Sequence, residues 1–332
     1  MEIVEENEFW EAQNSLQKIK QEIQSFIVGQ EEALNQILWS MFAGGHALLE
    51  GLPGVGKTMM IKTISDAMSL TFSRVQFTPD LMPADITGTM MIEPDENGKQ
   101  QFVFHRGPVF SNIVLADEIN RATPKTQSAL LEAMGEKTVT VVGKTEQLPE
   151  PFIVLATQNP IDLEGTYPLP EAQVDRFLCK INITYPTKEE LRTIIDRTVT
   201  NKKESILPVI SNLDVIQIQK LASNILVAEE MLDFAINTIM ATHPDNELAP
   251  DTVRKYVRFG SGPRGLQSMI KVAKVRALME GRFNVSIGDL KQVALPVLRH
   301  RIFLNFEGEA SGITTDSLIN DVLQSISEEQ PA

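Results

Sequence analysis

The 332-residue chain has few cysteines, few histidines and a shortage of basic side chains. Its one cysteine, Cys179, cannot form a disulfide within the chain, and its place in a strand-like run predicts a buried structural thiol. The four histidines are scattered without ligand spacing, so no metal site built from them is expected. With 30 basic against 44 acidic residues, the net charge of −14 argues against general affinity for nucleic acid, whose binding depends on basic side chains that displace counterions.

Long hydrophobic runs are also lacking. None reaches the roughly 18 residues needed to cross a bilayer, which predicts that the chain has no membrane span. The acidic stretch 1–6 lacks the basic region and the apolar core of a signal peptide, so a cytoplasmic protein is expected. Hydrophobic residues at 42% and charged residues at 22% are ordinary for a soluble globular chain, and the length allows two domains.

A phosphate-binding loop is the most specific motif. Residues 51–58 read GLPGVGKT, which matches Gly, four residues, then Gly-Lys-Ser/Thr, and they lie between an apolar strand pattern and a helical one. In such a loop the backbone N–H groups converge on phosphate oxygens, Lys57 carries a positive charge to the outer phosphates, and the Thr58 hydroxyl can ligate Mg²⁺. The residues expected to bind ATP here are Gly51, Pro53, Gly54, Val55, Gly56, Lys57 and Thr58.

Alternating strand and helix patterns surround this loop. The strands are expected at 46–50, 71–77, 112–117, 151–157 and 179–183, and the helices near 57–68, 124–135 and 170–177. Such alternation predicts an α/β fold with a mainly parallel sheet, in which ligands bind beyond the carboxyl ends of the strands. A helix, a turn at 28–30 and a second helix are expected over 15–43.

Two segments interrupt the alternation, at 89–105 and 138–148. Each reads as two β-rich runs joined by a turn, and Asn97-Gly98 is a strong hairpin signal. Neither hairpin is needed to complete a nucleotide-binding core. They are therefore candidates for contacts with a neighbouring subunit or a substrate, or else surface hairpins that cover the sheet.

After residue 186 the patterns become helical. Helices are expected at roughly 187–200, 213–224, 228–242, 250–259, 263–280 and 286–299, which predicts an all-helical second domain. The chain turns acidic and polar from about 307, and its end, 325–332, is expected to fray. The expected division is a nucleotide-binding core at 1–185, a helical domain at 186–310 and an acidic tail at 311–332.

Two acidic residues follow the apolar strand pattern at 113–116. Asp117 is placed to orient Mg²⁺ and its waters, and Glu118 to polarise an attacking water. A strand that ends in Asp-Glu is by itself equally consistent with a helix N-cap. The phosphate-binding loop one strand earlier favours the catalytic interpretation.

Three further polar residues are candidates for the same site. Asn159 follows the next strand and is placed to hold the lytic water or sense the γ-phosphate, or else it is a turn residue before proline. Arg176 ends a short predicted helix, where it either complements the helix dipole or reaches a neighbouring subunit's nucleotide as an arginine finger. Arg264 begins a long helix, either as a surface arginine or as a cation that the second domain brings to the phosphates.

Together these residues resemble the AAA+ ATPases, and more specifically the MoxR family. Beyond the loop and the acidic strand, the stretches that carry the resemblance are 76–88, 117–122, 127–136, 156–177 and 297–306. The resemblance implies a P-loop NTPase core of three layers with two inserted hairpins, followed by a helical lid. It makes Lys57 and Thr58 similar to the Walker A pair, Asp117 and Glu118 to Walker B, Asn159 to sensor 1, Arg176 to the arginine finger in trans, Arg264 to sensor 2, and Val28 and Gly29 to the segment that packs on adenine.

The resemblance also implies partners. The family commonly forms a hexameric ring, uses ATP with Mg²⁺, and has a chaperone-like role in maturing or assembling protein complexes, often with a partner that carries a von Willebrand factor A domain. Arg121 is a second candidate for a trans contact, and whether Arg264 acts in cis or in trans stays open. Two alternatives remain: a nucleic-acid motor or loader, to which Lys137 and Lys144 beside the second hairpin would contribute, and a nucleotide-gated scaffold with little turnover.

Overall fold

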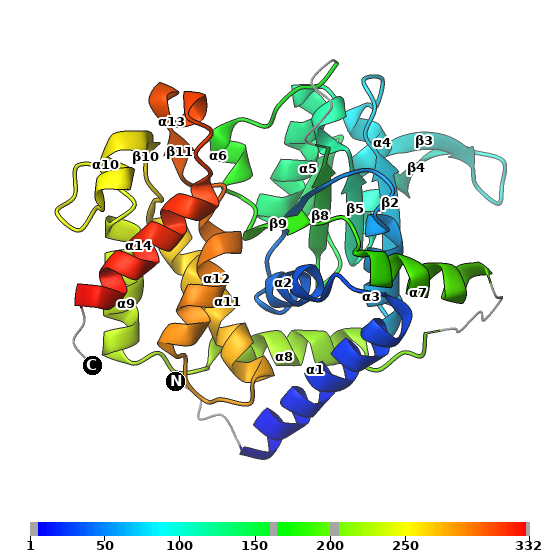
Figure 1. Ribbon diagram of the computed structural model, residues 1–332. Helices are drawn as coiled ribbons and strands as arrows, with labels where there is room; N and C mark the ends of the chain where they lie inside the picture. Colours follow the sequence, from blue (N-terminus) through cyan, green and yellow to red (C-terminus); the bar gives the residue numbers. More distant parts are fainter. Residues whose placement is uncertain (1–5, 160–164, 200–205, 330–332) are drawn as a thin grey trace.

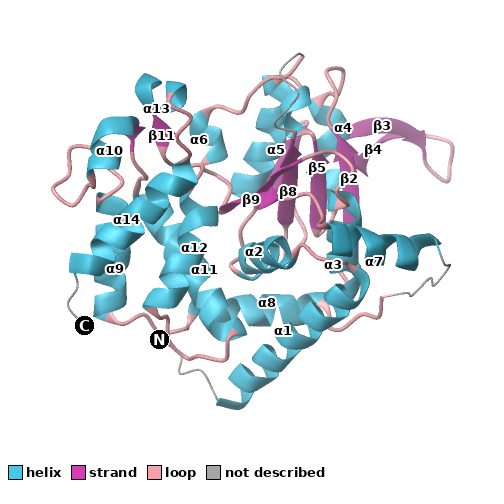
Figure 2. Cartoon of the chain, viewed as in Figure 1, coloured by secondary structure: helices cyan, strands magenta, loops and turns pink. Residues whose placement is uncertain are grey.

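The computed structural model describes residues 6–159, 165–199 and 206–329. A five-stranded sheet stands between helices, and a mostly helical unit packs beside it (Figures 1 and 2). The strands of the sheet lie in the order β2-β5-β8-β1-β9, and each pair of neighbours is parallel. The strands are β1 (Ala47–Gly51), β2 (Phe72–Gln76), β5 (Ile113–Asp117), β8 (Ile153–Gln158) and β9 (Cys179–Ile183). The predicted fold class is confirmed.

The central strands are apolar on both faces because helices cover both sides of the sheet. Successive residues alternate between two cores: Leu115 of β5 faces one, and its neighbours Val114 and Ala116 face the other. The first core is continuous with the interior of the helical unit, where Val272 and Leu290 are fully buried. The helical unit is therefore packed directly against the sheet-bearing core.

Helices of the core connect these strands. They are α1 (Glu6–Phe26), α2 (Glu31–Phe42), α3 (Lys57–Ala67), α4 (Pro83–Thr87), α5 (Pro124–Glu136) and α6 (Glu171–Val174), with 3₁₀ turns η1 (Pro108–Phe110) and η2 (Ile119–Arg121). The first helix begins well before the expected residue 15, because Phe9 and Ala12 continue its buried stripe. The helix expected at 170–177 is wrong in length: α6 ends at Val174, so Arg176 lies in the turn before β9.

Both predicted hairpins are present. β3 (Gly88–Pro94) pairs with β4 (Gln100–Arg106), and β6 (Thr138–Val141) pairs with β7 (Lys144–Gln147). The β3–β4 hairpin extends away from the sheet edge in Figure 1. Its register places Ile92 opposite Phe102, and both side chains are exposed. A role for these hairpins in binding a neighbour or a substrate stays a prediction.

The second unit, here called the lid, is mostly helical. Its helices are α7 (Lys188–Val199), α8 (Asn212–Ser223), α9 (Glu229–Met240), α10 (Asp251–Tyr256), α11 (Pro263–Met279), α12 (Ile287–Leu298), α13 (Phe306–Ala310) and α14 (Thr315–Glu329). The helix expected over 250–259 ends at Tyr256. The next residues form β10 (Val257–Phe259), which pairs antiparallel with β11 (Phe303–Leu304), so the lid also holds a small sheet.

The expected acidic tail at 311–332 is wrong for most of its length. Residues 315–329 form α14, which buries Leu318, Val322 and Ile326. The helix contacts α9, α10 and α12. An apolar stripe at helical spacing holds this helix to the lid, and Asp316 at its start pairs with the buried side chain of Arg299. Residues 330–332 lie outside the described part of the chain.

The first helix, α1, connects core and lid. It contacts α3 of the core and α11 of the lid. Gln17 Nε2 donates to the carbonyl of Met279 at 2.9 Å, and Phe9 stacks on Phe283 with ring centroids 3.8 Å apart. Its buried residues therefore depend on both units for their packing.

Two buried titratable side chains lie in or beside the sheet. Cys179 is buried in β9, and burial raises the pKa of its thiol to about 11. His46 stands before β1, where its Nδ1 accepts from the Val154 N–H at 2.9 Å and its Nε2 lies 3.3 Å from the Met134 carbonyl. Burial lowers the pKa of His46 to about 4, because the charged ring would lose its hydration, and the positive charge of Lys137 acts in the same direction. His46 is thus a neutral structural residue.

This neutrality predicts a pH dependence of stability. Between pH 6.5 and about 4 the unfolded chain protonates His46 while the folded chain does not, so this part of the stability is present above pH 6.5 and is lost as the pH falls. The loss amounts to about 3 kcal/mol across that range. Urea denaturation at several pH values should show a steeper acid decline for the parent than for His46→Gln. Parallel profiles would contradict the assignment.

Within the described ranges, no helix is long and apolar enough to span a membrane. The same residues contain no grouping of His, Cys, Asp and Glu side chains suited to hold a metal ion by themselves.

Candidate active site

The phosphate-binding loop runs between the end of β1 and the start of α3. Gly54 and Gly56 have φ angles of 81° and 84°, in the left-handed region that other residues rarely adopt. A Cβ added at either position would meet no atom within 4 Å, so the loop opens onto free space. No side chain caps the N-terminus of α3. An open loop before an uncapped helix start suits a phosphate chain.

Lys57 is the first residue of α3 and is folded back over this loop. Its Nζ donates to the Gly51 carbonyl at 2.7 Å and to the Leu52 carbonyl at 3.3 Å. Partial burial lowers the pKa of Lys57, and the negative charges of Asp117 and Glu118 act in the opposite direction. The ammonium group therefore lies within the field of both acids, bonded to carbonyls that phosphate oxygens can replace.

Asp117 ends β5 and is held by two neighbouring strands. Its Oδ1 accepts from the Thr157 hydroxyl at 2.6 Å. Its Oδ2 accepts from Arg74 Nη2 at 2.7 Å and from Arg74 Nε at 3.1 Å. These bonds fix the carboxylate at the carboxyl edge of the sheet, where a divalent ion bound to phosphates would lie.

Glu118 follows in a left-handed conformation, with φ 57° and ψ 51°. Its N–H donates to the Thr157 hydroxyl at 2.8 Å, which supports a backbone form that non-glycine residues avoid. Its Oε2 accepts from Gln76 Nε2 at 3.0 Å and from Arg121 Nε at 3.0 Å. The side chain makes no capping bond to η2, so the N-cap alternative does not describe this carboxylate.

Arg74, Gln76 and Thr157 also belong to this site, although they were not among the site residues predicted from the sequence. Their proximity to the two acids follows from the register of the sheet. Gln76 pairs with Asp117, and Ala116 pairs with Ala156, which brings Thr157 beside Asp117. Thr157 bonds both acids at once, so it couples the position of one to the other.

The remaining predicted residues lie around this edge. Asn159 directly follows β8, which lies between β1 and β5, and is half-buried. Val28 and Gly29 form the break between α1 and α2. Gly29 has a φ of 69°, and an added Cβ would meet the Glu190 carboxylate of α7. The positive φ favours glycine at this position, whereas the end of the flexible Glu190 side chain can move aside. Contact of Gly29 with adenine stays a prediction.

The two predicted arginines lie at the junction of core and lid. Arg176 is exposed, and its Nη1 donates to the Leu131 carbonyl of α5 at 2.9 Å. Arg264 of α11 is 67% exposed, and its Nη1 is 3.3 Å from Asp175 Oδ2. The structure therefore gathers Lys57, Asp117 and Glu118 at one sheet edge and places both arginines at a separate surface.

Comparisons with known proteins identify the family of the chain. Residues 46–179 match the ATPase family associated with various cellular activities (AAA), and residues 251–322 match the AAA lid domain, a range that includes part of α14. Chaperone MoxR1 of Mycobacterium tuberculosis is 42% identical, with 94% of this chain and 82% of that protein covered. Protein MoxR of Methylorubrum extorquens is 27% identical, with 95% of this chain and 94% of that protein covered.

A solved structure shows the same architecture over nearly the whole chain. The crystal structure of a candidate ATPase from Cytophaga hutchinsonii superposes with a TM-score of 0.90 at 40% identity, covering 96% of each chain. The match thus spans the sheet, the inserted hairpins and the lid. The phosphate-binding loop, the acidic strand end, the lid and these relatives lead to one assignment: the chain belongs to the MoxR family of AAA+ ATPases.

Proposed function

We propose that the protein is a ring-forming ATPase that uses ATP hydrolysis to remodel client proteins during the maturation or assembly of complexes. The observation that carries the ATPase part of the proposal is that one connected set of hydrogen bonds holds two adjacent acids in place at the carboxyl edge of the sheet. Asp117 is held by Arg74 and Thr157, and Glu118 by Gln76 and Arg121. One carboxylate can thus serve a metal while the other serves water.

The residues present fit ATP and Mg²⁺. The open loop at 51–58 and Lys57 would hold the phosphates, with Val28 and Gly29 beside the adenine. Thr58 and Asp117 would hold Mg²⁺, which when bound would neutralise developing charge on the phosphates. Glu118 takes the proton of the attacking water, and Asn159 orients that water.

Arg176 would complete the site of a neighbouring subunit. Arg176 is exposed as a residue, and its Nη1 donates to the Leu131 carbonyl of α5, which holds the side chain against its own subunit near the surface. A residue that acts in trans requires an adjacent subunit, and a closed ring, commonly a hexamer in this family, would supply one to every site. The name of the Mycobacterium tuberculosis relative, a chaperone, supports a protein client, and a partner with a von Willebrand factor A domain fits the same role.

Hydrolysis measured against protein concentration tests the trans site. The activity per subunit should rise as rings assemble and then level off, because an isolated subunit lacks the neighbour's Arg176. Arg176→Ala should remain at the low value at every concentration. An activity per subunit that is flat across the assembly range would contradict the trans site, and a uniformly low one would favour the nucleotide-gated scaffold.

A further inference from the structure

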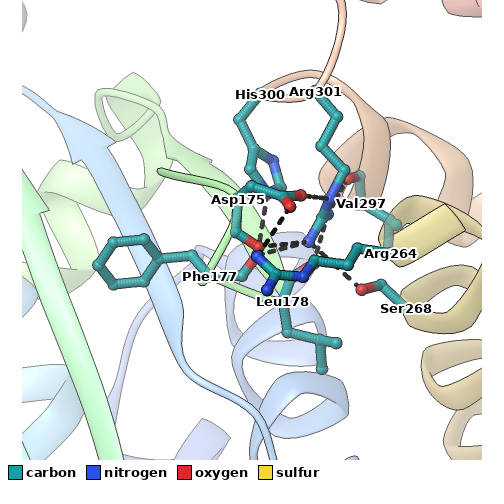
Figure 3. A network of polar contacts seen from close by, with 8 residues as sticks. All are labelled: Asp175, Phe177, Leu178, Arg264, Ser268, Val297, His300 and Arg301. Carbon is teal, nitrogen blue, oxygen red and sulfur yellow. Dashed lines mark hydrogen bonds and ion pairs between the residues drawn. The ribbon is translucent and has the colours of Figure 1, made fainter. Parts of the chain in front are cut away.

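A buried arginine of the lid forms hydrogen bonds with the residues on either side of Arg176 (Figure 3). Arg301 follows α12, and its side chain is 3% exposed. Its Nε donates to Asp175 Oδ1 at 2.8 Å, and its Nη2 donates to the Phe177 carbonyl at 2.8 Å. Its Nη1 donates to the Leu178 carbonyl at 3.1 Å. One guanidinium thus binds acceptors on both sides of Arg176.

The two residues before Arg301 bond the same stretch. His300 Nε2 lies 3.0 Å from the Phe177 carbonyl, and Arg299 Nη1 donates to the Lys180 carbonyl at 3.3 Å. Burial lowers the pKa of His300 well below its usual range, so the ring is neutral and donates through Nε2. Three consecutive lid residues therefore bond residues 175–180 of the core.

Asp175 forms ion pairs with two lid arginines, one buried and one exposed. Arg301 is buried and cannot leave the carboxylate without stranding a charge. Arg264 is 67% exposed and holds the same carboxylate by one contact of 3.3 Å. Arg264 can therefore depart toward a phosphate while Arg301 stays. The link between the lid and the Arg176 segment persists through that exchange.

A simple structural ion pair would not need this geometry. The planar guanidinium offers five N–H donors in a fixed fork. Here it donates to a carboxylate and several backbone carbonyls of one core turn, and also to the Val297 carbonyl and the Ser268 hydroxyl of the lid. Such a set fixes the orientation of the turn as well as its distance from the lid. The side chain of Arg176 leaves from the middle of that turn.

We propose that Arg301 is a positioning residue for Arg176, so that movement of a subunit's own lid sets whether its Arg176 reaches the neighbour's nucleotide. The inference rests on the proposed function, in which Arg176 acts in trans. It assigns to Arg301 an effect on the adjacent subunit's site, in addition to any effect on its own.

Mixed rings separate these effects. The donor subunit carries Glu118→Gln, which keeps Arg176 but cannot hydrolyse ATP, and the receiver carries Arg176→Ala, which keeps Glu118. Mixing the two should restore ATP hydrolysis at receiver sites that border donors. Arg301→Lys is then added to the donor alone or to the receiver alone. Lysine keeps the positive charge but lacks the planar set of five N–H donors.

The expected result is asymmetric. Arg301→Lys in the donor should lower the restored activity by about tenfold or more, because a misplaced group costs rate steeply, while the same change in the receiver should have a much smaller effect. Equal effects in both arms would overturn the inference and leave Arg301 with a structural role. No restored activity even without Arg301→Lys would instead contradict the proposed trans function.

Two further variants distinguish a loss of positioning from a folding defect. Arg282→Lys disturbs another arginine–aspartate pair, with buried Asp289, which lies within the lid, and it should reduce activity alike in donor and receiver. Asp175→Asn weakens the Arg301 contact from the core side at a half-buried position and should reproduce the donor-specific loss. If Arg301→Lys does not fold, Asp175→Asn decides the question by the same asymmetry.

Discussion

Replacing Glu118 by glutamine is expected to lower kcat for ATP hydrolysis by about 100-fold to 10,000-fold while leaving ATP affinity nearly unchanged. The amide keeps the size of the side chain and one oxygen that can accept from Gln76 or Arg121. It cannot take a proton from water. Phosphate release reports the rate, and equilibrium titration with ATP reports the affinity.

The matched control is Glu132→Gln, which makes the same chemical change at an exposed position of α5. It should hydrolyse ATP at the parent rate. A Glu118→Gln variant that did the same would show that the proton acceptor lies elsewhere. Loss of ATP binding in Glu118→Gln would show that the carboxylate serves the nucleotide or its metal, as proposed for Asp117.

The second large effect concerns the stability of the lid. Asp289, the third residue of α12, is fully buried and accepts from Arg276, from Arg282 and from the Ser286 N–H. Burial acts to raise the pKa of Asp289, but hydrogen bonds from these three residues outweigh it and lower the pKa. Asp289→Ala should destabilise the protein by about 3–5 kcal/mol, because two arginines lose their shared counter-charge.

Urea denaturation measures this loss, and Glu307→Ala serves as the control. Glu307 pairs with Lys255 where both side chains are more than half exposed, so its removal should change the midpoint little. Since the pKa of Asp289 is lowered on folding, its contribution is present above about pH 3.8 and is lost at more acid pH. A midpoint like that of Glu307→Ala would show that the arginines find water or other acceptors.

The phosphate-binding edge was predictable because its signals are local. The loop at 51–58 and the polar residues after β5 each stand within a few residues of an apolar strand pattern, and parallel topology brings strand ends together. The supports of these residues were not predictable. Arg74 and Thr157 reach Asp117 from 43 and 40 residues away, and only the register of the sheet decides that contact.

The lid was predicted less well, for two different reasons. In α14 the helical spacing of Leu318, Val322 and Ile326 is present in the sequence. The prediction gave more weight to the acidic composition of the segment and therefore missed the helix. In β10 and β11 there is no local signal, because strands of three and two residues form only when the lid has folded. The ion pair between Arg301 and Asp175, 126 residues apart, likewise depends on how the lid packs against the core.

The bridging position of α1 imposes an order on folding during synthesis. The helix is synthesised before the other helices described, yet Phe9 stacks on Phe283 and Gln17 bonds Met279, 262 residues further along the chain. The part of its apolar stripe that faces the lid therefore stays uncovered until α11 and Phe283 have been synthesised, whereas the part that faces α3 can be covered earlier. A nascent chain that is halted before α11 emerges would expose that stripe and offer a binding surface to holding chaperones, whereas release of the full chain would remove it.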